Sequence, residues 1–229
     1  MTHEDVIAAL KAAADPDEIP GVARFYSGDL PDTVIIGVPH PLIFKLAKPF
    51  TDLPIPEIEP LLDDPRYELR MAAVSIMDFK AAKPKLPEED RKALFDLYIR
   101  RHDRIDNWDL VDRAAPRVLG RWLVDKDRSV LDDLALSDQP MQRRSAIVAS
   151  FAFLRLGQSE DTFRIAGLLA GDPHPHVQKA VGSWLREAGK HDEAGLVAFL
   201  RAYRDVLPKP TRRAATTNLP VEYQAELRG

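Results

Sequence analysis

Two charged residues occupy unexpected places on helices that the sequence predicts. At about 100° per residue, the segment that follows Asn107 has an apolar stripe that includes Trp108, and Asp112 lies on its edge, about 40° from Trp108. In the segment that follows Pro140, Arg144 emerges from the middle of the apolar face. A buried carboxylate without a partner is costly. These side chains therefore either form an ion pair between adjacent helices or open into a groove that binds a ligand.

Other kinds of catalytic site find little support. The chain has no cysteine, which excludes disulfides, thiolate zinc sites and cysteine nucleophiles. It also lacks the Gly-x-Ser-x-Gly, Walker and His-Glu-x-x-His motifs. His174 and His176 flank Pro175 with a spacing that metal ligands can have, but the sequence fixes no companion ligand. We interpret this segment as a loop at a helix start and expect no metal site.

Helical periodicity extends over almost the whole chain. Apolar residues recur at intervals of three and four, as in Val6, Leu10 and Ala13. The only β-like run, residues 33–38, is too short and isolated to build a sheet. The 19 prolines then separate many short helices, because proline is tolerated in the first helical turn or between helices.

Four predicted helix starts recur at similar intervals. They lie at Asp64, Asp106, Asp138 and Asp172, 32 to 42 residues apart, and each aspartate could cap free backbone N–H groups. Such intervals are typical of helical-pair repeats of the HEAT and armadillo kind. We therefore predict an all-α fold, a HEAT-like α-solenoid formed by residues 1–229 as a single domain, with a concave face suited to a long ligand. An irregular helical bundle is the alternative.

Charge is unevenly distributed along a chain of ordinary soluble composition. Residues 1–97 contain 11 basic and 18 acidic residues, whereas residues 98–229 contain 21 basic and 18 acidic residues. We therefore expect an acidic N-terminal part, 1–97, and a nucleic-acid surface on the repeats of 98–220. The polar, acidic N-terminus and the lack of a long apolar run predict a cytoplasmic protein without a membrane partner.

Four short sequence segments, in their order along the chain, resemble segments of a known protein family. They are WDLVD at 108–112, QRRSAI at 142–147, VQKAVGSWLRE at 177–187 and, more weakly, TRRAATTNLP at 211–220. Together they resemble the AlkD-like DNA alkylation repair glycosylases, HEAT-repeat proteins that excise cationic N3- and N7-alkylated purines. The resemblance implies a DNA glycosylase of base excision repair, a hydrolase that acts on duplex DNA without metal or cofactor. We expect a monomer.

The resemblance also implies roles for individual residues. By position, Asp112 would be the catalytic carboxylate beside the sugar, Trp108 would pack against the lesion nucleotide, and Arg144 would grip a phosphate. A carboxylate can stabilise an oxocarbenium-like sugar or act as a general base, and an indole face can hold a cation. The further basic candidates for DNA binding are Arg113, Arg117, Arg143, Lys179, Arg212 and Arg213.

The sequence departs from the family pattern at the second lesion-contacting tryptophan. Ser183 occupies that position, and Trp184 follows one residue later. A shift of one residue rotates the indole by about 100°, which places Trp184 in the predicted core stripe of its helix. Trp184 is therefore either a core residue or a DNA contact. The alternative function is a non-catalytic HEAT-repeat module that binds DNA structure or a protein partner.

Overall fold

The computed structural model describes residues 1–228 as helices joined by turns and loops, without a β-strand in that range. One isolated bridge joins Val34 and Arg66. The prediction of an all-α helical-repeat fold is therefore confirmed, and residues 33–38 form no sheet. Within residues 1–228, no helix is long and apolar enough to cross a membrane.

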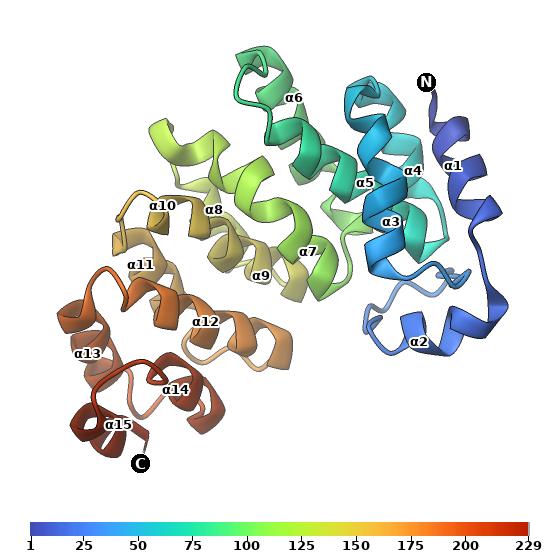
Figure 1. Ribbon diagram of the computed structural model, residues 1–229. Helices are drawn as coiled ribbons and strands as arrows, with labels where there is room; N and C mark the ends of the chain where they lie inside the picture. The colour runs from blue at the N-terminus through green and yellow to red at the C-terminus, as the bar shows by residue number, and fades with distance from the viewer. Residues whose placement is uncertain (229) are drawn as a thin grey trace. The chain divides into compact units, whose positions relative to one another are not determined.

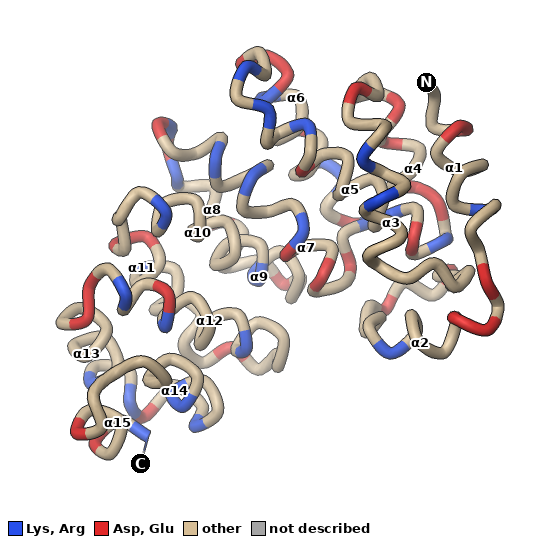
Figure 2. The backbone as a smooth tube through the Cα atoms, in the orientation of Figure 1, with Lys and Arg blue, Asp and Glu red and all other residues tan. Residues whose placement is uncertain are grey.

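The chain divides into two compact units, Met1–Trp122 and Leu123–Gly229. The predicted change from an acidic to a DNA-facing part, between residues 97 and 98, falls inside helix α6 (Glu88–Arg100) and does not coincide with this boundary. Figure 2 marks acidic residues in red on the segment that joins α1 to α2, in the first unit, and basic residues in blue along α7 and the turns that follow it.

The first unit is built around a buried central helix. Its elements are α1 (His3–Ala12), η1 (Pro16–Glu18), α2 (Ile19–Ala23), α3 (His40–Ala47), η2 (Lys48–Asp52), η3 (Ile55–Glu57), α4 (Glu59–Asp63), α5 (Tyr67–Ala81), α6, η4 (His102–Arg104), α7 (Trp108–Ala115) and η5 (Pro116–Gly120). Helix α5 packs against α3, α4 and α7 (Figure 1) and is buried on all sides. A helix with apolar residues on every face belongs in a core, so α5 positions its neighbours.

A buried carboxylate organises the loop that precedes α3. The side chain of Glu68, on α5, accepts hydrogen bonds from the backbone N–H groups of Ile36, Gly37 and Val38. Gly37 has φ +82°, and a Cβ atom there would lie 1.9 Å from the carbonyl oxygen of Asp15. Only glycine fits this position without strain. The β-like run is therefore a loop held by a helix.

The second unit also consists of short helices. After η6 (Trp122–Asp125), which contains the boundary, its elements are α8 (Val130–Ala135), α9 (Pro140–Ala149), α10 (Phe151–Leu154), α11 (Glu160–Leu168), α12 (Pro175–Ala188), α13 (Glu193–Ala202), α14 (Lys209–Ala215) and α15 (Val221–Arg228). Helix α12 packs on α9 and on α14. Gly182 permits the second contact, because a Cβ atom there would lie 3.0 Å from the Ala214 side chain.

The aspartates at the predicted helix starts act differently from the prediction. The N-cap positions of α5 and α12 are occupied by Arg66 and His174. Asp64 and Asp172 lie two residues earlier, where each carboxylate accepts the N–H of the N-cap residue at 2.8 Å. This geometry is an Asx turn that directs the chain into the helix, not a cap on the helix itself.

Candidate functional site

Helix α7 carries two of the predicted site residues. Trp108 begins the helix and Asp112 follows four residues later, so both side chains leave α7 on the same side. Both residues are partly exposed, whereas Leu110, Val111 and Ala114 are buried. The apolar side fixes α7 on α5 and leaves Trp108 and Asp112 accessible.

Asn107 precedes Trp108 and is fully buried. Its Oδ1 accepts hydrogen bonds from the backbone N–H and the hydroxyl of Ser27, both at 3.0 Å. Its Nδ2 donates to the carbonyl oxygen of Phe25 at 2.9 Å and to Oδ1 of Asp109 at 2.6 Å. The side chain therefore joins the start of α7 to the segment 25–27, eighty residues earlier in the chain.

Asp109 follows Trp108 and is also buried. Its Oδ2 accepts a hydrogen bond from the hydroxyl of Tyr67 and lies 3.2 Å from Nε2 of His40. The same His40 nitrogen lies 2.7 Å from the Tyr67 oxygen. Burial, followed by the charge of Asp109, raises the pKa of Tyr67, so its hydroxyl stays protonated and donates to the carboxylate.

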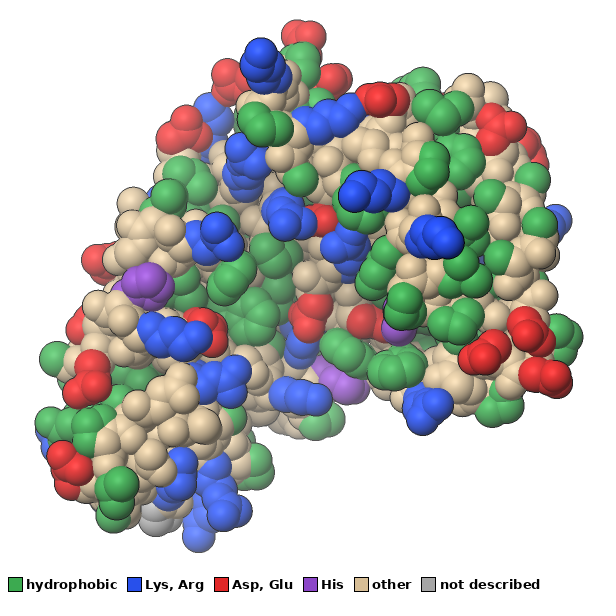
Figure 3. Space-filling view, in the orientation of Figure 1, with side chains coloured by type: hydrophobic (Ala, Val, Ile, Leu, Met, Phe, Trp, Pro, Cys, Tyr) green, Lys and Arg blue, Asp and Glu red, His purple; other side chains and the backbone are tan. Residues whose placement is uncertain are grey.

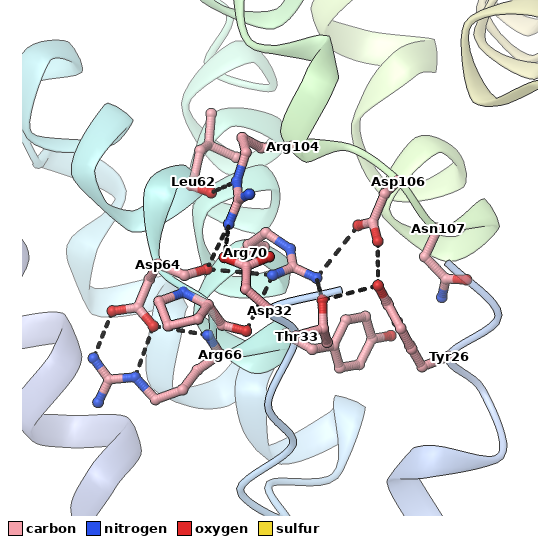
Figure 4. Close-up of polar contacts among 12 residues, drawn as sticks. Tyr26, Asp32, Thr33, Leu62, Asp64, Arg66, Arg70, Arg104, Asp106 and Asn107 are labelled. Atoms are coloured by element: carbon pink, nitrogen blue, oxygen red, sulfur yellow. Dashed lines mark hydrogen bonds and ion pairs between the residues drawn. The ribbon is translucent and has the colours of Figure 1, made fainter. Parts of the chain in front are cut away.

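A second polar network precedes α7 in the chain (Figure 4). The hydroxyl of Tyr26 donates to Oδ2 of Asp106 and lies 2.9 Å from Oγ1 of Thr33. Arg70, fully buried on α5, donates to Thr33 at 2.8 Å and lies 3.4 Å from Asp106. Burial and the hydrogen bond to Asp106 raise the pKa of Tyr26 to about 12. The network ties the loop around Tyr26 to α5 and to the residues before α7.

An aromatic cluster adjoins these networks. The rings of Phe25 and His40 meet edge to face with centroids 5.2 Å apart, and His40 lies nearly parallel to Phe44 at 6.1 Å. Phe25 is 41% exposed, and Arg24 lies 5.9 Å above its ring. The first unit thus presents an accessible aromatic surface on the segment that Asn107 binds.

Arg113 and Arg117, two predicted DNA contacts, are both bound by Asp78 of α5. Nη1 of Arg113 lies 3.0 Å from Asp78, and its guanidinium lies 4.7 Å and 4.6 Å from the ring centres of Phe44 and Phe79. Burial lowers the pKa of Arg113. Arg117 pairs with Asp78 at 2.7 Å but is 52% exposed. We assign Arg113 to the packing of α7 and keep only Arg117 as a candidate contact.

The second unit holds Arg143 and Arg144 on α9. Arg143 binds Asp172 through Nε at 2.5 Å and Nη2 at 3.2 Å, and we assign it to the packing of α9 against the start of α12. Arg144 is only 4% exposed, and its Nη1 donates to the carbonyl oxygen of His176. Its place in an apolar face is as predicted. The ion pair with Asp112 stays a prediction, because the two residues belong to different units.

The remaining basic candidates differ in exposure. Lys179 on α12 and Arg213 on α14 are exposed. Arg212 is 6% exposed, and its guanidinium donates to the carbonyl oxygens of Arg204, Leu207 and Leu227. We therefore assign Arg212 to the packing of the second unit and leave it out of the DNA-binding set. On the face shown in Figure 3, basic side chains of each unit lie among hydrophobic ones.

Trp184 packs against the junction of α9 and α10. Its indole N–H donates to the carbonyl oxygen of Val148 at 3.2 Å, and its ring meets Phe151 edge to face at 6.0 Å. Trp184 and Ser183 are both partly exposed. The indole is thus oriented by its own unit, which favours the interpretation of Trp184 as a packing residue.

Sequence reasoning missed the residues that hold the start of α7. Asn107, Asp109, Tyr67 and His40 were not predicted as members of the site. The available signal was the spacing of Asp106, Asp109 and Asp112, three carboxylates at intervals of three around Trp108.

A family model described as "DNA alkylation repair enzyme" matches residues 6–219. The chain belongs to this DNA alkylation repair family. The match begins within α1 and ends just before α15, so it includes both units and every predicted site residue.

A solved structure supports the assignment of this DNA alkylation repair family member to the same fold. It is named as a predicted DNA alkylation repair enzyme from Enterococcus faecalis, with a TM-score of 0.69 and 17% sequence identity. The similarity covers 91% of this chain and 97% of that chain, so the two share the helical fold over most of their length. No curated protein sequence matches the chain significantly.

Proposed function

We propose that the protein hydrolyses the N-glycosidic bond of cationic N3- and N7-alkylated purines in duplex DNA, as a glycosylase of base excision repair. Membership of the DNA alkylation repair family supports alkylated DNA as the substrate. The observation that carries the proposal is the pair formed by Asp112 and Trp108, both partly exposed and one helical turn apart on α7.

The proposed chemistry follows from the charge of the substrate. An alkylated purine is positively charged, and when its bond to C1′ breaks the electron pair neutralises the departing base while positive charge develops on the sugar. Asp112 would stabilise this oxocarbenium-like charge. Water then adds to C1′ and loses a proton, for which Asp112 is the general base. The indole face of Trp108 would hold the cationic lesion.

We further propose that exposed cations of both units bind the phosphate backbone. Arg117, Lys179 and Arg213 retain exposed side chains, and Arg144 is kept as a phosphate contact on the resemblance alone. The use of the Trp184 indole N–H by Val148 favours a second candidate, a non-catalytic module that binds DNA structure.

The test is release of 7-methylguanine and 3-methyladenine from methylated duplex DNA. We expect Asp112→Asn to lower the release rate by about a hundredfold or more, because it removes the charge but preserves the shape. Asp133→Asn, a change of an exposed aspartate on α8, is the matched control and should leave release unchanged.

Equal rates for Asp112→Asn and the unsubstituted protein would exclude Asp112 as the catalytic group. Absence of release from folded protein that still binds duplex DNA would support the non-catalytic module. Absence of binding as well would exclude both candidates and direct attention to a protein partner.

A further inference from the structure

Both chain neighbours of Trp108 form hydrogen bonds with backbone or side-chain groups from elsewhere in the first unit. Asn107 is bound to Phe25 and Ser27, and Asp109 is bound to Tyr67 and faces His40. The two neighbours are also bound to each other, through Nδ2 of Asn107 and Oδ1 of Asp109 at 2.6 Å. The residue between them therefore starts its side chain from a fixed stretch of backbone.

The side chain of Asn107 binds the segment 25–27 and does not cap α7, although Asn107 is the N-cap residue of this helix. An asparagine at the N-cap normally accepts a hydrogen bond from the N–H groups of the first helical turn. Here its Oδ1 accepts from Ser27 instead, and its carbonyl oxygen accepts the N–H of Val111 at 3.3 Å. The buried side chain of Asn107 therefore fixes the start of α7 against a segment eighty residues earlier in the chain.

The first turn of a helix is normally its least constrained part, because its N–H groups have no intrahelical partners. Trp108 is the first residue of α7 and is partly exposed, so an unrestrained start would let the indole sample many positions. The hydrogen bonds of Asn107 and Asp109 limit the movement of the backbone from which the indole extends, before any ligand binds.

We propose that Asn107, together with Asp109, is a positioning residue that orients the Trp108 indole in the free protein. The expected effect on the excision rate rests on the proposed glycosylase function. The expected restraint of the Trp108 indole does not depend on that function.

The structural consequence is measured by fluorescence. The chain has three tryptophans, so a protein with Trp122→Phe and Trp184→Phe emits from Trp108 alone. In that background we expect Asn107→Ala to increase acrylamide quenching and to add a nanosecond component to the anisotropy decay. Asn218→Ala, at the only other asparagine of the chain and exposed in the second unit, should change neither. A folded Asn107→Ala protein with unchanged Trp108 quenching and anisotropy would overturn the proposal.

The kinetic consequence is measured in the protein with all three tryptophans. We expect Asn107→Ala to lower the single-turnover excision rate by about tenfold to a hundredfold, with a much smaller change in the Kd for DNA, because orientation is lost and contacts are kept. An unchanged rate in a variant whose Trp108 has become mobile would refute the role of indole orientation in excision. A lack of excision by the unsubstituted protein would refute the proposed function, and the fluorescence result would still decide the structural inference.

Milder variants keep the proposal testable if Asn107→Ala does not fold. Ser27→Ala removes one donor to Asn107, and Tyr67→Phe removes one donor to Asp109. Each should increase Trp108 quenching, by less than Asn107→Ala would. Failure of both folded variants to alter Trp108 would contradict the positioning role.

Discussion

His102 is a buried ionisable residue whose environment disfavours its charged form. It is 4% exposed, and its ring meets Tyr98 edge to face at 5.4 Å. Burial lowers the pKa of His102 from 6.5 to about 4. The imidazole of His102 therefore binds a proton less readily in the folded protein than in the unfolded chain.

This shift predicts a pH-dependent stability. Because the folded-state pKa is depressed, the contribution of His102 is fully present above pH 6.5 and is lost as the pH falls toward 4, in total about 3 kcal/mol. We expect the free energy of unfolding in urea to fall more steeply between pH 7 and pH 4.5 in the unsubstituted protein than in His102→Gln. Parallel pH curves for the two proteins would refute this assignment.

The charged residues show how much of the site the sequence could predict. Periodicity correctly placed Trp108 and Asp112 on one side of a helix and Arg144 in an apolar face. It did not predict that Arg113 binds Asp78 or that Arg143 binds Asp172, because a helical wheel identifies a face and not the neighbour that covers it. The DNA-binding role expected of these two arginines stays a prediction.

Two glycines, Gly37 and Gly157, have left-handed backbone conformations but different surroundings, so substitutions at them should differ in their effect on stability. Gly37 has φ +82° and Gly157 has φ +76°. A Cβ atom at Gly37 would collide with the Asp15 carbonyl, whereas at Gly157 it would meet no atom of the described chain within 4 Å. We expect Gly157→Ala to cost about 1 kcal/mol of unfolding free energy, from backbone strain alone. Gly37→Ala should cost at least about 2 kcal/mol more, because the loop before α3 must move.

Urea unfolding of the two glycine variants at neutral pH measures the difference. Similar losses of stability would mean that the Asp15 carbonyl moves aside easily, and that the contact does not fix the loop.

At the level of elements, the starts of α5, α7, α9 and α12 were predictable because aspartate, with a nearby proline or asparagine, marks them locally. The short helices between residues 48 and 63 were not resolved by the sequence, since their prolines are compatible with either loops or helical turns. The networks around α7 were equally hidden, because their partners lie 42 and 80 residues away in the chain.

At the level of the whole molecule, the distribution of cations limits any contact with DNA. The first unit contains 17 basic and 22 acidic residues, and the second contains 15 and 14. Several arginines are bound to carboxylates or carbonyl groups of their own unit, as Arg113, Arg143 and Arg212 are. DNA binding should therefore use few phosphate contacts.

With four proposed phosphate contacts, we accordingly expect the logarithm of the DNA association constant to fall against the logarithm of salt concentration with a slope of about −3.6. Arg213→Ala should reduce the magnitude of this slope by about 1, because an exposed phosphate contact is lost. Arg201→Ala should leave it unchanged, since Arg201, an exposed arginine that pairs with Glu226, is not one of the proposed phosphate contacts. A slope that Arg213→Ala does not alter would remove Arg213 from the proposed interface.

The hydrogen bonds of Glu68 give the loop before α3 an unusual dynamic character. Amide protons in a loop normally exchange with solvent through small local fluctuations. The amides of Ile36, Gly37 and Val38 are instead held by a carboxylate on the most buried helix of the first unit. We therefore expect their exchange with deuterium to be as slow as that of the α5 amides, as it would be if this loop and α5 open together.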